Sequence, residues 1–175
     1  RMDGTDLFSL AGKTALITGS SQGIGFALAR GLGQAGARLI LNGRDTHKLT
    51  AAAEHLQSEG IAARTLAFDV TDQPEVQRIV TADVETHGCP DILINNAGMQ
   101  FRSPLQAFPP HRFDALLQTH VASVLYVAQA VARHMSSRRS GKIINISSLP
   151  TALPRPRIAP SPATHGPGAH LTQAP

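Results

Sequence analysis

The chain has 175 residues, of which 42% are hydrophobic, and a formal net charge of +4 at pH 7. This length is typical of one globular domain. No apolar run approaches the length of about 20 residues that a membrane span needs. The basic excess lies in residues 115–175, which hold six Lys and Arg and no Asp or Glu, and aromatic residues make up 4%, so nucleic-acid binding is disfavoured. The first ten residues lack the apolar stretch of a secretory signal, and the single cysteine, Cys89, cannot form an internal disulfide, so we expect a cytoplasmic protein.

Short apolar runs alternate with helical patterns along the chain. The predicted strands are 13–18, 38–41, 64–68, 91–95 and 142–147, and the predicted helices are 24–35, 45–59, 72–87 and 112–136. Gly36 and Gly60 are expected to end the first two helices. Asp45 is expected to cap the second helix, and Pro74 suits the first turn of the third.

This alternation indicates a parallel sheet with helices on both faces. Right-handed crossovers then give a doubly wound, Rossmann-type α/β sheet with strand order 3-2-1-4-5. We expect a nucleotide-binding domain over residues 1–148. Seven of the twelve prolines fall in residues 150–175, so we expect residues 149–175 to form an irregular tail.

The segment from Thr18 to Gly25, TGSSQGIG, joins the first strand to the first helix. Glycines at these points permit a tight turn and let backbone N–H groups approach a pyrophosphate. The helix N-terminus adds partial positive charge. The spacing Gly-x3-Gly-x-Gly differs from the G-x-G-x-x-G of the general dinucleotide fingerprint, and a glycine turn without a ligand is the alternative interpretation.

Two further strand ends carry polar or small residues. NNAG at 95–98 follows the fourth strand, and Asp69-Val70 follows the third. Each has a simple structural explanation, Asp69 as the cap of the next helix and the two asparagines as a turn. Because the carboxyl ends of parallel strands open onto one crevice, all three together predict cofactor binding.

With these motifs, residues 7–173 resemble the short-chain dehydrogenase/reductase family, whose TGxxxGIG and NNAG motifs are intact here. LFSLAGK at 7–13, ITGSSQGIGFALA at 17–29 and NNAGMQFR at 95–102 are most similar to the gluconate 5-dehydrogenase branch. The resemblance implies that the pyrophosphate is held by Gly19, Ser21, Gln22, Gly23, Ile24 and Gly25. It likewise implies that Asp69 and Val70 meet the adenine, and that the nicotinamide ribose is lined by Asn96, Ala97 and Gly98.

The resemblance also implies an NAD(P)-dependent oxidoreductase that transfers hydride at a secondary alcohol of a sugar acid or polyol, of the gluconate/5-ketogluconate type.

The end of the second strand, LNGRD at 41–45, bears on the choice of cofactor. An acidic residue there binds the ribose 2′-OH of NAD and repels the 2′-phosphate of NADP, whereas an arginine binds the 2′-phosphate. Gly43 stands where NAD-preferring relatives carry the acid, and Arg44 follows, so we expect NADP as the preferred cofactor and NAD as the alternative.

The resemblance implies four catalytic residues: a serine, a tyrosine that acts as acid and base, a lysine that lowers the pKa of this tyrosine, and an asparagine on a helix. The present sequence departs from this pattern. Ser148 matches the serine, but Ser161 stands in the tyrosine position, His165 in the lysine position and His120 in the asparagine position. A serine hydroxyl is a poorer acid than a phenol and too short to reach the same point. We therefore expect an impaired or inactive chain, and the alternative function is a non-catalytic nucleotide-binding pseudoenzyme or fragment.

The remaining expectations concern assembly and neighbouring side chains. We expect the last strands of the family fold to be missing, which leaves 142–147 as an apolar edge strand. The resemblance implies homo-oligomers paired through the long helix. Tyr126 is expected in the core or an interface, and Arg102 either faces solvent or meets a substrate carboxylate. The histidines have no metal-ligand spacing, so no metal site is predicted.

Overall fold

The computed structural model describes residues 6–147, so the predicted tail at 149–175 lies outside the described part. Within that part, one parallel sheet has the order β3-β2-β1-β4-β5, which confirms the predicted Rossmann-type topology. Its strands are β1 (Thr14–Ile17), β2 (Arg38–Gly43), β3 (Ala63–Ala67), β4 (Ile92–Asn95) and β5 (Lys142–Asn145).

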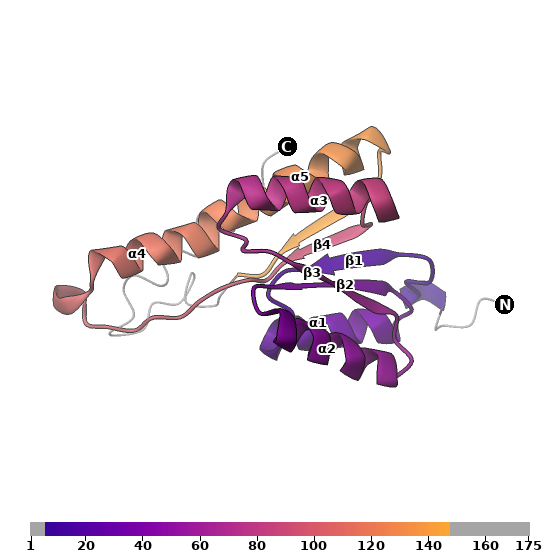
Figure 1. Ribbon diagram of the computed structural model, residues 1–175, viewed down its shortest axis with the longest axis horizontal. Helices are drawn as coiled ribbons and strands as arrows, with labels where there is room; N and C mark the ends of the chain where they lie inside the picture. The colour runs from indigo at the N-terminus through magenta and orange to yellow at the C-terminus, as the bar shows by residue number, and fades with distance from the viewer. Residues whose placement is uncertain (1–5, 148–175) are drawn as a thin grey trace.

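Helices cover both faces of this sheet (Figure 1). On one face lie α1 (Gly23–Gln34) and α2 (Thr46–Ser58), and on the other lie α3 (Gln73–His87) and α5 (Ser123–Ser137). A π-helical turn, η3 (Gln118–Ala122), joins α5 to α4 (Pro110–Leu117), which extends past the carboxyl ends of the strands. Two short 3-10 turns complete the described part, η1 (Asp6–Phe8) and η2 (Leu105–Ala107).

The core consists of two apolar clusters, one on each face of the sheet. Successive strand side chains point to opposite faces, so Ile17 packs with α1 and α2 while its neighbour Leu16 packs with α3 and α5. Leu39 and Ile40 on β2 divide in the same way. Apolar residues on both faces explain why the strands have continuous rather than alternating hydrophobic sequences.

Asp45, Gly36 and Gly60 act at the helix ends as predicted, and Asp72 is an N-cap that was not predicted. The Asp45 carboxylate accepts a hydrogen bond from the Lys48 N–H at 3.1 Å, and the Asp72 carboxylate accepts one from the Glu75 N–H at 3.0 Å. Gly36 and Gly60, with φ of +99° and +79°, follow α1 and α2 in the left-handed region that favours glycine. These residues therefore fix where the helices turn back toward the sheet.

The predicted long helix is present but not uniform. It spans Pro110–Ser137, begins two residues earlier than predicted and contains the π turn. By length and composition alone this stretch would be able to cross a membrane, which differs from the expectation of no such run. In the fold it serves as a core helix, because Val127, Ala130 and Val131 on α5 are completely buried.

Candidate functional site

The glycine-rich loop between β1 and α1 uses its glycines in different ways. Gly19 and Gly23 have φ of +62° and +61°, so both occupy the left-handed region. A Cβ on Gly19 would lie 2.8 Å from the Ala97 Cα. A Cβ on Gly25 would collide with the Gly19 carbonyl oxygen and the Asn96 side-chain amide. Two of the glycines therefore permit the close approach of this loop to the NNAG loop.

Thr18 connects these two loops through hydrogen bonds. Its buried hydroxyl oxygen accepts from the backbone N–H groups of Asn96 and Ala97, both at 2.9 Å. In return, the Asn96 side-chain amide donates to the Thr18 carbonyl at 3.0 Å and the Gly19 carbonyl at 3.2 Å. These bonds hold the carboxyl ends of β1 and β4 together, in agreement with the prediction that the two ends border one crevice.

Asn42 forms a second buried link, from β1 through β2 to β3. Its side-chain amide donates to the carbonyls of Leu66 at 3.1 Å and Phe68 at 3.2 Å. Its backbone N–H donates to the Ser20 hydroxyl at 3.1 Å, and its backbone carbonyl accepts from the Ser20 N–H at 2.9 Å. These roles of Ser20 and Asn42 could not be predicted from the sequence, because the bonds from Asn42 to Ser20, Leu66 and Phe68 each span more than 20 residues and leave no local pattern.

The first turn of α1 faces the crevice without a side-chain cap. Gln22 is the N-cap residue, and its side chain forms no capping hydrogen bond. Beside it, Ile24 is 69% exposed although it is apolar. A Cβ on Gly23 would meet no atom of residues 6–147 within 4 Å, apart from the adjoining residues. An open helix N-terminus with free space beside it favours binding of an anionic group.

Asp69 and Arg44 lie together at the mouth of the crevice. The Asp69 carboxylate accepts from the Thr71 N–H at 2.9 Å and the Thr71 hydroxyl at 2.7 Å. Partial burial raises the Asp69 pKa, but these bonds and the Arg44 guanidinium outweigh that effect and lower the pKa below its ordinary value of 3.8. The capping interpretation of Asp69 is wrong, because Asp72 caps α3. The side chain of Val70 packs in the core.

His120 lies in the π turn and lines a small pocket. The other lining residues are Asn95, Ala97, Val124, Asn145, Ile146 and Ser147. The His120 Nε2 lies 2.8 Å from the Met99 carbonyl oxygen, and the Asn95 amide donates to the Asn145 side-chain oxygen at 2.9 Å. Gly98 adjoins this histidine, since a Cβ there would lie 3.3 Å from its Cε1. The pocket joins the NNAG loop to the end of β5.

Three predicted catalytic positions, Ser148, Ser161 and His165, lie outside the described residues. Ser148 directly follows Ser147, the last described residue of the pocket wall. Arg102 is exposed, and the half-buried Tyr126 lines a groove beside the start of α3. Among residues 6–147, no group of three or more His, Cys, Asp or Glu is placed to hold a metal ion.

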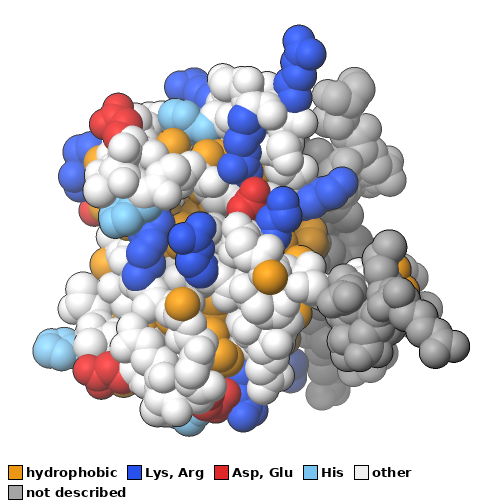
Figure 2. All heavy atoms as spheres, turned by 90° about the vertical axis from the view of Figure 1, so that its right-hand side faces the viewer, with side chains coloured by type: hydrophobic (Ala, Val, Ile, Leu, Met, Phe, Trp, Pro, Cys, Tyr) orange, Lys and Arg blue, Asp and Glu red, His pale blue; other side chains and the backbone are white. Residues whose placement is uncertain are grey.

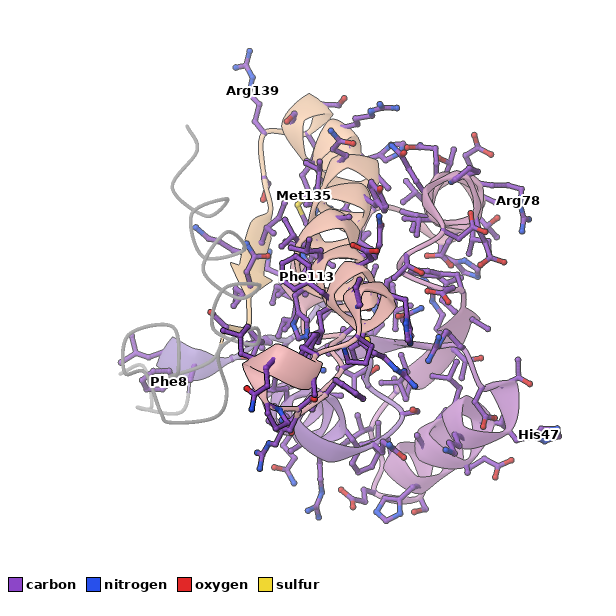
Figure 3. All side chains as sticks on the ribbon, turned by 90° about the vertical axis from the view of Figure 1, so that its left-hand side faces the viewer. Phe8, His47, Arg78, Phe113, Met135 and Arg139 are labelled. Atoms are coloured by element: carbon purple, nitrogen blue, oxygen red, sulfur yellow. The ribbon has the colours of Figure 1, made fainter. Side chains whose placement is uncertain are left out.

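The two ends of the sheet differ in surface chemistry. Figure 2 looks onto the amino ends of the strands, where several Lys and Arg side chains are spread over the surface. Asp91 there pairs with Lys13 at 3.9 Å and Arg138 at 3.4 Å. Figure 3 shows the opposite end, with α4, which carries Phe113, projecting toward the viewer. The loops with glycines and asparagines lie at this carboxyl end, where doubly wound sheets bind ligands.

Comparisons with known proteins agree with this geometry. A family model described as short chain dehydrogenase matches residues 13–174. Gluconate 5-dehydrogenase of Gluconobacter oxydans (strain 621H) is 49% identical over 172 residues, which are 98% of this chain and 67% of that protein. 5-Keto-D-gluconate 5-reductase of Escherichia coli (strain K12) is 44% identical over 168 residues, covering 96% of this chain and 66% of that protein.

A solved structure is also similar. It is a gluconate 5-dehydrogenase from Burkholderia cenocepacia J2315 in complex with NADP and tartrate, with a TM-score of 0.93 and 46% identity. The match covers 98% of this chain and 67% of that one. The chain thus spans about two thirds of the length of the relatives that it matches.

Proposed function

The chain belongs to the short-chain dehydrogenase family, and from this premise we propose that it binds NADP in preference to NAD. We propose further that the protein is an oxidoreductase that transfers hydride between NADP and a secondary alcohol of a sugar acid or polyol. The similarity to gluconate 5-dehydrogenase and 5-keto-D-gluconate 5-reductase supports the gluconate/5-ketogluconate pair as substrate. A cytoplasmic location is part of the same proposal.

The crevice at the carboxyl end of the sheet carries this proposal, and its residues fit a dinucleotide. The uncapped N-terminus of α1, with open space at Gly23, suits a pyrophosphate. The exposed Arg44 at the end of β2 suits the 2′-phosphate, because a guanidinium forms paired hydrogen bonds with phosphate oxygens. The buried bonds of Thr18 and Asn42 keep the surrounding loops in place before the ligand arrives.

The nicotinamide of NADP, when bound, supplies or accepts the hydride. The remaining functions belong to the protein. The loop at 96–98 would line the ribose next to the pocket, and Ser148 would donate a hydrogen bond to the substrate oxygen. Arg102, exposed in the loop after NNAG, is available to a substrate carboxylate. Proton transfer is the weak step, since Ser161 and His165 occupy the tyrosine and lysine positions.

The second candidate function is nucleotide binding without catalysis. It is favoured by the combination of intact cofactor motifs with the replaced residues at positions 120, 161 and 165. A reference tyrosine has a pKa of about 10 and needs help to act near neutrality. A serine hydroxyl in that position is a poorer acid, and a histidine in the lysine position no longer provides a permanent charge.

Titration of the chain with NADPH and with NADH, followed by cofactor fluorescence, tests the proposal. We expect tighter binding of NADPH, and an Arg44→Ala variant that loses this preference but still binds NADH. Failure to bind either cofactor would overturn the proposal. The rate of NADP-linked oxidation of gluconate then separates the two candidate functions. If catalysis has been lost at positions 161 and 165 alone, the double variant Ser161→Tyr/His165→Lys is expected to oxidise gluconate faster than the unaltered chain.

A further inference from the structure

Arg44 and Asp69 form an ion pair across the two strand ends that border the proposed adenosine site. Gly43 at the end of β2 is in register with Ala67 at the end of β3, so the residues that follow them are brought together. The Arg44 Nη1 lies 3.4 Å from the Asp69 Oδ2. The Arg44 side chain is 78% exposed and that of Asp69 is 32% exposed. The pair therefore lies in the opening of the crevice rather than beneath it.

The two partners are held with different firmness. The Oδ1 of Asp69 accepts both hydrogen bonds from Thr71, and the Asp69 backbone N–H donates to the Glu75 carboxylate at 3.0 Å. The carboxylate is thus fixed, with its Oδ2 toward Arg44. Among the residues that the structure describes, Asp69 is the acid paired with Arg44. A long, exposed arginine side chain is free to leave such a partner at small cost.

A 2′-phosphate would need the same guanidinium. Arginine binds carboxylates and phosphates through the same N–H groups, so Arg44 cannot direct one fork to both acids with full strength. We propose that Asp69 is a specificity-determining residue that competes with the 2′-phosphate of NADP for Arg44 and so limits the preference for NADP over NAD. This inference rests on the proposed function, because it presumes that the adenosine end of a dinucleotide lies between the two residues.

The size of the effect follows from the exposure of the pair. Exposed ion pairs contribute about 0.2–1 kcal/mol, which corresponds to about a 1.4- to fivefold change in an equilibrium. Replacing Asp69 by asparagine keeps an oxygen for the Thr71 bonds and removes only the charge. The preference for the phosphorylated ligand should then rise by up to about fivefold, whatever the variant does to adenine binding itself, since that change affects both ligands alike.

Calorimetric titration with adenosine 2′,5′-bisphosphate and with 5′-AMP tests this, because the two ligands differ only in the 2′-phosphate. The ratio of their affinities is measured for the unaltered chain, Asp69→Asn, Arg44→Ala and the double variant. We expect Asp69→Asn to raise the ratio when Arg44 is present and to leave it unchanged when Arg44 is absent. Glu54→Gln, which removes an exposed charge on α2, is the matched control and should leave the ratio unaltered.

Each outcome decides between the two proposals. Binding of neither ligand by the unaltered chain overturns the proposed function and this inference with it. Binding of both ligands with an unchanged or lowered ratio in Asp69→Asn overturns the inference alone. An equal rise with and without Arg44 also overturns it, because Asp69 would then repel the phosphate directly rather than compete for the arginine.

Discussion

Two regions of the crevice are built in different ways. The crevice floor, which is formed by the loops at 18–25, 42–45 and 95–98, is held by hydrogen bonds of Thr18 with Asn96 and of Asn42 with Ser20, and Asn42 also bonds to β3. The outer wall, residues 99–122 with β5, has an exposed loop, a projecting α4 and exposed apolar side chains such as Ile144. Rigid loops suit a ligand of fixed shape, whereas a less closely packed wall allows different substrates on the same frame.

The largest effect is expected from Asn42→Leu in the crevice floor. This change removes the side-chain amide that donates to the carbonyls of Leu66 and Phe68, and each buried group left unsatisfied costs about 1–3 kcal/mol. We expect the free energy of unfolding to fall by up to about 2–6 kcal/mol in urea titrations. Gln129→Leu on the exposed side of α5 is the control, and a similar loss there would remove the special role given to Asn42.

A pair of glycine variants on one helix tests the contact between loops. Gly25→Ala places a methyl group against the Gly19 carbonyl and the Asn96 amide, so we expect a loss of about 1–3 kcal/mol in stability together with weaker nucleotide binding. Gly31→Ala places its methyl group more than 4 Å from the other atoms of the described chain, apart from the adjoining residues of its helix, and should instead gain about 0.5–1 kcal/mol in stability. Thermal unfolding and cofactor titration of both variants would contradict this contrast if the two behaved alike.

The pKa of Asp69 predicts a smaller effect that depends on pH. Because the pKa is lowered in the folded chain, the ionised carboxylate stabilises the fold above its ordinary pKa of 3.8, and this contribution is lost as the pH falls through the folded value. Asp69→Asn should therefore be less stable than the unaltered chain at pH 7, with the difference shrinking below pH 3.8. Urea midpoints across this range measure it, and a constant difference would argue against ionisation as the cause.

The smallest effect on stability is expected in the outer wall. Ile144 is 45% exposed, so Ile144→Lys should change the free energy of unfolding by no more than about 0.5 kcal/mol and should reduce aggregation at the sheet edge. The neighbouring Ile143 packs against the cluster with α3 and α5, so Ile143→Lys should be clearly destabilising. Light scattering and urea unfolding of the two variants check both statements, and equal stability losses would show that β5 is buried on both faces.

The sequence was sufficient for the sheet order, which follows from the alternation of strands and helices with right-handed crossovers, and for the ends of α1 and α2, which follow from local patterns. Asp45, Gly36 and Gly60 act over distances of a few residues, so their roles can be predicted from neighbouring positions. The bonds of Thr18 to Asn96 and of Asn42 to Phe68 join residues that are far apart in the chain. Such partners become apparent only once the strands are side by side.

The candidate site shows the same division. The glycine and NNAG motifs predicted where the crevice would lie, but not that Asp69 would face Arg44 or that His120 would contact the Met99 carbonyl. Asp69 was either the cap of the next helix or a residue of the crevice. The two alternatives differ by a shift of three residues in the start of the helix, which hydrophobic periodicity does not resolve. Ser161 and His165 remain predictions from the resemblance.

The π turn at Gln118–Ala122 sets the rotational phase between the two parts of the long helix. A π turn accommodates one residue more than the same length of α-helix, and each residue advances the helix by about 100°. If the same residues were wound as a regular α-helix throughout, the extra residue would rotate α4 by about 100° relative to α5; the π turn absorbs it instead. The face of α4 that lies on the same side as the buried face of α5 is therefore set by a single residue of chain length, independently of the side chains on it.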